Sequence, residues 1–300
     1  MTRVVTLLPA ATEIVAALGD AGVLVGISHE CDYPAYIQHL PRVTTTSIDV
    51  GASSGAIDAE VRALRESGRA VIAVDAEEIR RLNPDVIVTQ ALCEVCAVSD
   101  GEVHRLAATL DRAPQLVSLT AQTIHGIWMD IRAVGRALGA EAEAEDLVLG
   151  LQSRLEVIRD SAPPGLRPRV LCIEWLDPLF FAGHWVPEMV AAAGGDDVGA
   201  RPGADSTCHS WQEIVELRPD CLVVMLCGFG IERARAELER LDDRGAIEVL
   251  RRVPTWIIDG NAYTSRPGPR VVDGAVRIQS VLLEKPLAGV ERWEPAGICS

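Results

Sequence analysis

Residues 77–88 read Glu77-Glu78-Ile79-Arg80-Arg81-Leu82-Asn83-Pro84-Asp85-Val86-Ile87-Val88, and residues 212–223 repeat the pattern as Gln212-Glu213-Ile214-Val215-Glu216-Leu217-Arg218-Pro219-Asp220-Cys221-Leu222-Val223. Each copy is a helical pattern, a Pro-Asp turn and an apolar run typical of a buried strand. A weaker repeat pairs residues 13–17 with residues 188–192. A helix, Pro-Asp and a strand also form a common connection, but two lobes of similar fold explain both repeats.

Outside the repeat, short β-branched runs alternate with helical patterns, which predicts βα units and a parallel sheet in each half. The strand candidates are Val4–Leu8, Leu24–Ile27, Ala70–Val74, Val86–Thr89, Leu116–Leu119, Val170–Ile173, Leu179–Ala182, Cys221–Leu226 and Thr255–Ile258. Residues 122–160 are almost wholly helix-forming, and we expect Gly139 to divide them. The sequence therefore predicts an N-terminal α/β lobe over 1–121, a helical connector over 122–162 and a C-terminal α/β lobe over 163–300.

Composition excludes several classes of protein. The chain has 300 residues, of which 48% are apolar and 24% charged, as in globular proteins. Its formal net charge is −15 and Lys285 is its one lysine, so nucleic acid is not an expected partner. The longest apolar runs are too short to cross a bilayer. The first residues show no secretory signal pattern, so we expect a cytoplasmic protein that does not span a membrane.

Soft and polar side chains follow four of the predicted strands. In open parallel sheets, ligands bind beyond the carboxyl ends of the strands. The segments in question are Ser28-His29-Glu30-Cys31-Asp32-Tyr33-Pro34, Cys93-Glu94-Val95-Cys96, Gly183-His184-Trp185 and Cys227-Gly228-Phe229. These strand ends are the expected ligand site.

The eight cysteines are expected to be reduced thiols or metal ligands rather than a disulfide framework. Cys93 and Cys96 have the spacing that presents two thiolates from one turn, and His29, Cys31 and Cys227 are candidates for further ligands. Buried packing cysteines, thioredoxin-type redox chemistry and contacts with a bound ligand remain open. The chain lacks a Gly-x-Ser-x-Gly elbow, a P-loop and a Gly-x-Gly-x-x-Gly motif, which disfavours serine hydrolases and nucleotide enzymes.

Aromatic residues are few and concentrate near strand ends of the second lobe, where they suit a large planar ligand or belong to the core. The aromatic residues near these strand ends are Trp175, Phe180, Phe181, Trp185, Trp211 and Phe229. A long polar turn follows the last predicted strand, and its Arg266 or Arg270 is suited to a carboxylate, amide or phosphate. Pro267-Gly268-Pro269 is equally ordinary at the start of a helix.

The opening Leu7-Leu8-Pro9-Ala10-Ala11-Thr12-Glu13, with Val25-Gly26-Ile27-Ser28 and Asp32-Tyr33-Pro34, resembles the class III substrate-binding proteins of ABC importers, especially their vitamin B12-binding branch. Both Pro-Asp copies and Arg266-Pro267-Gly268-Pro269-Arg270 are similar too, so the resemblance covers essentially the whole chain. It implies two Rossmann-like lobes with parallel sheets joined by one long helix. It also implies a ligand gripped between the lobes, with little domain closure.

The strand-end segments look like a subgroup without a signal peptide that is usually labelled cobalamin-binding protein. This resemblance implies a ligand-binding protein rather than an enzyme, with a corrinoid (cobalamin-like) or related metal-chelate ligand. Taken together, the residues expected to contact the ligand are His29, Glu30, Tyr33, Trp175, His184, Trp185, Phe229, Arg266 and Arg270.

The chain departs from the exported vitamin B12 binders in two ways. Its first residues show no signal-peptide pattern, so we do not expect delivery to an ABC transporter, and its cysteine and histidine set is foreign to them. One alternative is direct binding of Zn, Fe or Co through Cys93, Cys96, Cys31, His29 and Cys227, as a store or a metal-dependent enzyme. The others are an enzyme that uses thiol chemistry and a scaffold role on an inherited fold.

Overall fold

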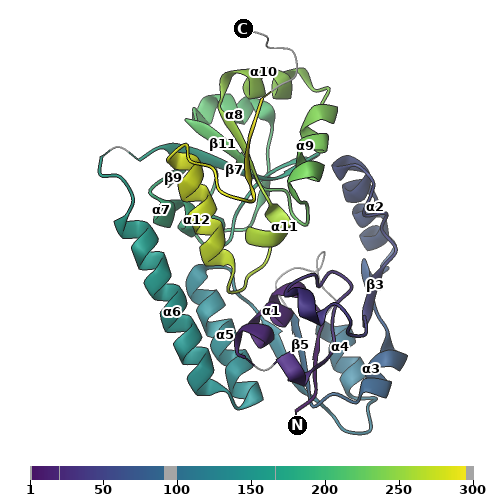
Figure 1. The fold of residues 1–300 in the computed structure, drawn as a ribbon. Coiled ribbons are helices and arrows are strands. Elements are labelled where there is room, and N and C mark those ends of the chain that lie inside the picture. The colour runs from purple at the N-terminus through teal and green to yellow at the C-terminus, as the bar shows by residue number, and fades with distance from the viewer. Residues whose placement is uncertain (1, 20, 91–99, 166, 295–300) are drawn as a thin grey trace. The chain divides into compact units, whose positions relative to one another are not determined.

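The computed structural model describes residues 2–19, 21–90, 100–165 and 167–294 (Figure 1). The chain divides into two compact units. Unit 1 consists of Met1–Ala52, Ala59–Ala121 and His125–Leu151. Unit 2 consists of Ser53–Asp58, Gln122–Ile124 and Gln152–Ser300.

Unit 1 is built on a parallel sheet with the strand order β2-β1-β5-β6. The strands are β1 (Val4–Thr6), β2 (Leu24–Gly26), β5 (Val86–Gln90) and β6 (Gln115–Leu119). Three helices of this unit are α1 (Pro9–Ala17), α3 (Ala76–Leu82) and α4 (Asp100–Ala107). All three residues of β1 are buried, as parallel strands covered on both faces require. The expected parallel sheet of the first half is confirmed.

One predicted strand of unit 1 lies outside this sheet. The run 70–74 forms β4 (Ile72–Val74), which pairs antiparallel with β3 (Thr44–Thr46), a strand that was not predicted. Residues of β4 alternate from buried to exposed, which is typical of an antiparallel ribbon with one face in solvent. The helix α2 (Ser54–Glu66) lies between these two strands in the sequence.

Unit 2 contains a mixed sheet with the order β10-β8-β7-β11-β12-β13. Its parallel strands are β7 (Arg169–Leu176), β11 (Cys221–Val224), β12 (Thr255–Ile258) and the short β9 (Asp196–Asp197) beside β7. Its antiparallel strands are β8 (Leu179–Phe181), β10 (Thr207–Cys208) and β13 (Val290–Trp293). The expected α/β class is therefore confirmed for the second half as well.

The direction of β8 corrects a prediction. Only Asp177 and Pro178 separate β7 from β8, and a parallel neighbour needs a crossover of a dozen or more residues. The two strands form a hairpin instead. His184 and Trp185 therefore do not follow the carboxyl end of a parallel strand, as the sequence interpretation assumed.

The helices of unit 2 cover both faces of its sheet. They are α7 (Val186–Ala193), α8 (Trp211–Leu217), α9 (Ile231–Arg240), α10 (Arg244–Arg252), α11 (Gly260–Tyr263) and α12 (Val271–Leu282). Helices α7 and α12 pack against each other (Figure 1). The apolar cluster that includes Leu171, Leu222 and Ile257 packs with residues of α8, α9 and α10. Burial of this cluster supplies the main stabilising free energy of the unit.

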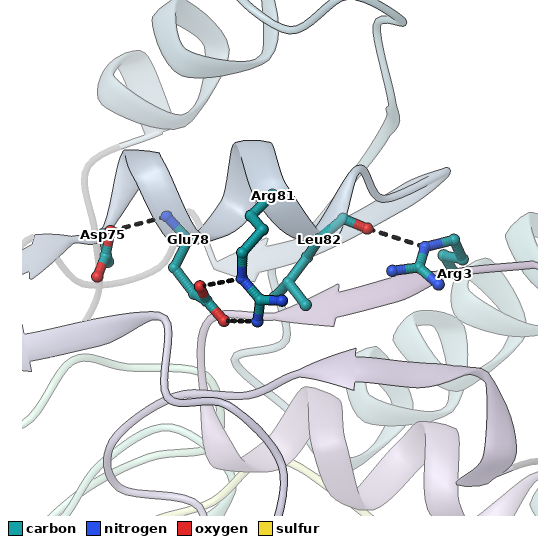
Figure 2. Close-up of polar contacts among 5 residues, drawn as sticks. All are labelled: Arg3, Asp75, Glu78, Arg81 and Leu82. Atoms are coloured by element: carbon teal, nitrogen blue, oxygen red, sulfur yellow. Dashed lines mark hydrogen bonds and ion pairs between the residues drawn. The ribbon is translucent and has the colours of Figure 1, made fainter.

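The repeated Pro-Asp turn has a specific structural role, seen first in unit 1, where Figure 2 shows the Arg3 side chain bonded to the Leu82 carbonyl at the end of α3. The Asp85 carboxylate accepts the backbone N–H of Arg3 at 2.9 Å, and the Arg3 side chain donates to the carbonyl oxygen of Leu82 at 2.8 Å. Helix α3, which ends at Leu82, is capped at its start by Asp75, whose carboxylate accepts the N–H of Glu78. The turn thus ties the end of α3 to the start of β1.

Unit 2 repeats the same pattern of hydrogen bonds. The Asp220 carboxylate accepts the N–H of Arg169 at 2.7 Å, and the Arg169 side chain donates to the carbonyl oxygens of Leu217 at 2.6 Å and Arg218 at 3.1 Å. Asn83 and Arg218 end their helices with left-handed backbone, at φ values of 42° and 47°. Equivalent bonds in both units support the interpretation of the repeat as two lobes of similar fold.

The connecting segment forms two helices, α5 (Ile124–Leu138) and α6 (Glu141–Asp160). Gly139 divides them, as predicted, and its φ of +69° is a conformation that glycine adopts without strain. The resemblance implied one long connecting helix, whereas the structure has two, and one of the boundaries between the units falls within α6, between Leu151 and Gln152. None of the helices described here is long and apolar enough to cross a bilayer.

Candidate functional site

The carboxyl edge of the unit 1 sheet carries the segment that follows β2. Ile27 continues the sheet by pairing with the segment at Arg42, and the Arg42 side chain donates to the carbonyl oxygens of Ser28 at 2.9 Å and Cys31 at 2.6 Å. These bonds fold the segment from Ser28 to Cys31 back over the end of the sheet. Glu30 lies on this segment and Tyr33 follows it, and both are exposed.

His29 is held by one buried threonine. Its backbone N–H donates to the Thr44 hydroxyl at 2.9 Å, and its Nδ1 lies 2.7 Å from the same oxygen. Thr44 in turn donates its single hydroxyl hydrogen to Ser28 Oγ at 3.1 Å. Because a hydroxyl has one donor and two acceptor positions, Thr44 must accept from both nitrogens of His29. The hydrogen of the neutral ring is therefore on Nδ1, and Nε2 carries the lone pair.

The electrostatic surroundings keep this imidazole neutral. Its pKa is lowered from the ordinary value of 6.5, first because the ring is partly withdrawn from water and second because the Arg42 guanidinium lies nearby. At pH 7 the ring is therefore an uncharged Nε2 base. A neutral imidazole nitrogen is a common ligand for transition metals.

Cys31 lies deeper than His29. It is 2% exposed, and its sulfur is 3.0 Å from Thr12 Oγ1, which is 2.6 Å from Thr6 Oγ1. Both threonines are fully buried. The thiol thus belongs to a chain of interior polar contacts beneath the strand ends.

The carboxyl edge of the unit 2 sheet carries an aromatic pair. Trp175, near the end of β7, and Phe229, which follows β11, make an edge-to-face contact with ring centroids 5.2 Å apart. The Arg233 guanidinium lies over the Phe229 ring at 3.7 Å from its centroid. Phe229 is 4% exposed, whereas Trp175 is only half-buried and donates its Nε1–H to the carbonyl of Asp177 at 3.0 Å. The contact with Phe229 and the bond to Asp177 therefore hold the Trp175 indole in place, and part of the indole remains exposed.

Three other predicted residues belong to unit 2. Cys227 is exposed, and its backbone N–H donates to the carbonyl of Glu174 at 3.0 Å. Arg266 follows β12 but is only 6% exposed, and it donates to Asn261 Oδ1 at 2.8 Å. Arg270 is the residue immediately before α12. Arg266 thus takes part in the structure of its own loop.

His184 and Trp185 form the entrance to α7. Trp185 is 6% exposed and donates its Nε1–H to the Thr264 carbonyl at 2.9 Å, which fixes α7 to the loop after β12. His184 has left-handed backbone, with a φ of 53°, and its N–H donates to the carbonyl of Ala204 at 2.6 Å. Its Nδ1 is buried and finds no hydrogen-bond partner among the described residues. Trp185 accordingly has a packing role.

The predicted metal ligands are only partly described. Cys93 and Cys96 lie outside the described residues. Of the others, His29 and Cys31 belong to unit 1 and Cys227 to unit 2. Within the described ranges, no group of three or more His, Cys, Asp and Glu side chains is arranged to hold a metal ion. Binding of a bare ion through these cysteines stays a prediction.

Three residues that hold the predicted site residues in place were not themselves predicted from the sequence. Thr44 holds His29 from a distance of 15 residues, Arg42 shapes the same segment, and Arg233 lies on α9. The β-branched run Thr44-Thr45-Thr46 was an available signal for strand β3. No local pattern indicated its pairing with His29, because that contact depends on the fold.

Comparison with known proteins agrees with the architecture. A model of the periplasmic binding protein family matches residues 4–256. An uncharacterized ABC transporter substrate-binding lipoprotein of Bacillus subtilis (strain 168), YvrC, is 24% identical over 291 residues, covering 91% of this chain and 77% of the relative.

Solved structures of similar fold cover nearly the whole chain. A periplasmic heme-binding protein from Pseudomonas aeruginosa superposes with a TM-score of 0.71 at 20% identity, covering 99% of each chain. The periplasmic vitamin B12-binding protein BtuF of Vibrio cholerae gives a TM-score of 0.65 at 19% identity, covering 94% of this chain and 97% of its own. The expected resemblance and fold class are confirmed. Since the family model matches most of its length, the chain belongs to the periplasmic binding protein family.

Proposed function

We propose that the chain binds a metal chelate with a large planar ring, either a corrinoid such as cobalamin or a related macrocycle such as haem. Family membership supports a small-molecule ligand and a transporter as its partner. Relatives of the same fold are described as binding heme or vitamin B12. The carboxyl edge of the unit 2 sheet supplies an aromatic surface.

The observation that carries the proposal is the Trp175–Phe229 pair. Phe229 is covered by Trp175 on one side and contacts the Arg233 guanidinium, so the pair is rigid. The half-buried indole offers a flat apolar face, and flat conjugated ligands pack on such faces. The guanidinium adds positive charge beside this face, and both haem and cobalamin carry anionic groups.

Purification under anaerobic conditions, followed by a visible spectrum and metal analysis, tests the proposal. The protein is then mixed with aquocobalamin or ferric haem, separated from free ligand and measured again. The expected result is a coloured protein with about one chelate per chain. A colourless protein that retains neither chelate would refute the proposal, and one zinc or iron per chain in its place would favour a bare-metal site.

A further inference from the structure

We infer that helix α2 is a mechanical link between the two units, held at its start by the Glu237 carboxylate of unit 2 and packed at its end into the core of unit 1. A boundary between the units falls inside this helix, between Asp58 and Ala59. The inference goes beyond the proposed function and does not depend on it, because it concerns how a change in one unit reaches the other.

The first step concerns the bond at the start of α2. The buried backbone N–H of Ser54 donates to Oε2 of Glu237 at 2.8 Å, and Glu237, on α9, is itself only 5% exposed. The first N–H groups of a helix have no partner within the helix, and a carboxylate there also stabilises the positive end of the helix dipole. The Arg240 side chain donates to Oε1 of Glu237 at 3.1 Å, so both oxygens of the carboxylate are fixed.

Two further contacts join the same turn to unit 2. A Cβ placed on Gly55 would lie 2.1 Å from Oδ2 and 2.9 Å from Cγ of Asp177, so the Asp177 carboxyl group packs directly against the helix backbone. Asp177 lies between β7 and β8, and its carbonyl accepts the indole N–H of Trp175. Ile57 packs against the apolar cluster of unit 2. The start of α2 is therefore fastened to the turn that also holds the Trp175 indole.

The second step concerns the rest of α2, which packs in unit 1. Leu64 is 6% exposed and belongs to the apolar cluster of unit 1, and Val61 packs against the same cluster. Since Val61 follows Ile57 by four residues and Leu64 follows Val61 by three, the three side chains lie on one face of the helix. This single stripe contributes its first residue to the core of unit 2 and its later residues to the core of unit 1.

Helix α5 begins in the same way. Its first residue, Ile124, belongs to unit 2, and the helix continues in unit 1 from His125. The N–H of Ile124 donates to Oε2 of Glu188, a residue of α7, at 2.6 Å. A helix is stiff because each turn is bonded to the next, so a helix that is held at both ends carries a displacement or a loss of order from one end to the other. Release of α2 from Glu237 is therefore expected to loosen the part of unit 1 that packs on α2.

The test compares Glu237→Ala with Glu237→Gln and with Glu239→Ala, the same change at an exposed position of the same helix. Glutamine keeps an oxygen that accepts the Ser54 N–H, whereas alanine removes the acceptor. Ile57→Ala is a second route to the same effect, because it weakens the packing of the first turn and leaves Glu237 in place. Hydrogen–deuterium exchange of the full chain, followed by mass spectrometry of its peptides, measures residues 54–58, residues 59–74 and strands β11 and β12 separately. Circular dichroism checks that each variant folds.

We expect exchange in residues 54–74 to rise about 10–100-fold in Glu237→Ala, as loss of a hydrogen bond to a charged group implies, while β11 and β12 stay protected. Ile57→Ala should raise exchange in the same residues, and Glu237→Gln and Glu239→Ala should resemble the unchanged chain. A rise confined to residues 54–58 would make the contact a local helix cap, and an equal rise in β11 and β12 would make it general destabilisation. Either result, or no rise at all, would overturn the inference and leave the proposed function standing, since no chelate is involved.

Discussion

Asp130 makes the stability of unit 1 depend on pH. This residue of α5 is 5% exposed, and its Oδ2 accepts the backbone N–H groups of Thr120 at 3.0 Å and Ala121 at 2.9 Å. These bonds hold the chain where β6 ends. Burial raises the pKa of the carboxyl from 3.8 to about 6, although the two hydrogen bonds lower it.

The magnitude follows from linkage. A shift of roughly 2 pKa units at about 1.4 kcal/mol each corresponds to about 3 kcal/mol. Because the folded-state pKa is raised, the folded chain binds the proton more tightly than the unfolded chain. Stability from this group is complete below pH 3.8 and is lost as the pH rises through about 6. Between pH 4.5 and pH 8 the loss is about 2 kcal/mol.

Asp130→Asn isolates this effect, since the amide oxygen accepts the same two N–H groups without a charge. Urea unfolding of the variant and the unchanged chain is measured at pH 4.5, 6 and 8. The difference in free energy of unfolding, variant minus unchanged chain, is expected to rise by about 2 kcal/mol from pH 4.5 to pH 8. Asp146→Asn, at an exposed position of α6, controls for the loss of one negative charge. A gain no larger than that of the control would refute the burial argument.

Two substitutions test the packing of unit 2. Gly274→Ala places a Cβ about 2.4 Å from the carbonyl oxygen of Tyr263, so we expect a loss of stability of about 1–3 kcal/mol, measured as a lower Tm. The control Gly150→Ala has open space around the new Cβ and should raise the Tm. An unchanged Tm for Gly274→Ala would contradict the packing around Gly274. Trp185→Phe removes the donor to the buried Thr264 carbonyl and is expected to cost about 1–3 kcal/mol in urea unfolding, and a cost near zero would show that the bond does not hold α7.

The fold class was accessible from the sequence because its signals are local. The Pro-Asp repeat, the alternation of apolar runs with helical patterns and the break at Gly139 all depend on neighbouring residues. The hydrogen bonds of Asp85 and Asp220 show why the repeat exists. The direction of β8 was also accessible, because the five residues between the predicted strands 170–173 and 179–182 are too few for the crossover that a parallel neighbour needs.

The site was less accessible because it depends on contacts distant in sequence. Strand-end reasoning selected His29, Trp175 and Phe229, which the structure places at the carboxyl edges of their own sheets. It also selected Trp185, which the structure buries against the loop after β12. The state of His29 depends on Thr44, and a contact between a loop residue and a strand residue 15 positions away leaves no periodic pattern in the sequence.

Calorimetric titration with aquocobalamin and ferric haem tests the central claim most directly. The account predicts saturable binding of at least one chelate at one per chain, weakened about 2–10-fold by Trp175→Ala through the loss of aromatic packing. Val215→Ala, at an exposed position of α8, should leave the affinity unchanged. Absence of binding by both chelates, or equal affinity in Trp175→Ala, would contradict the account.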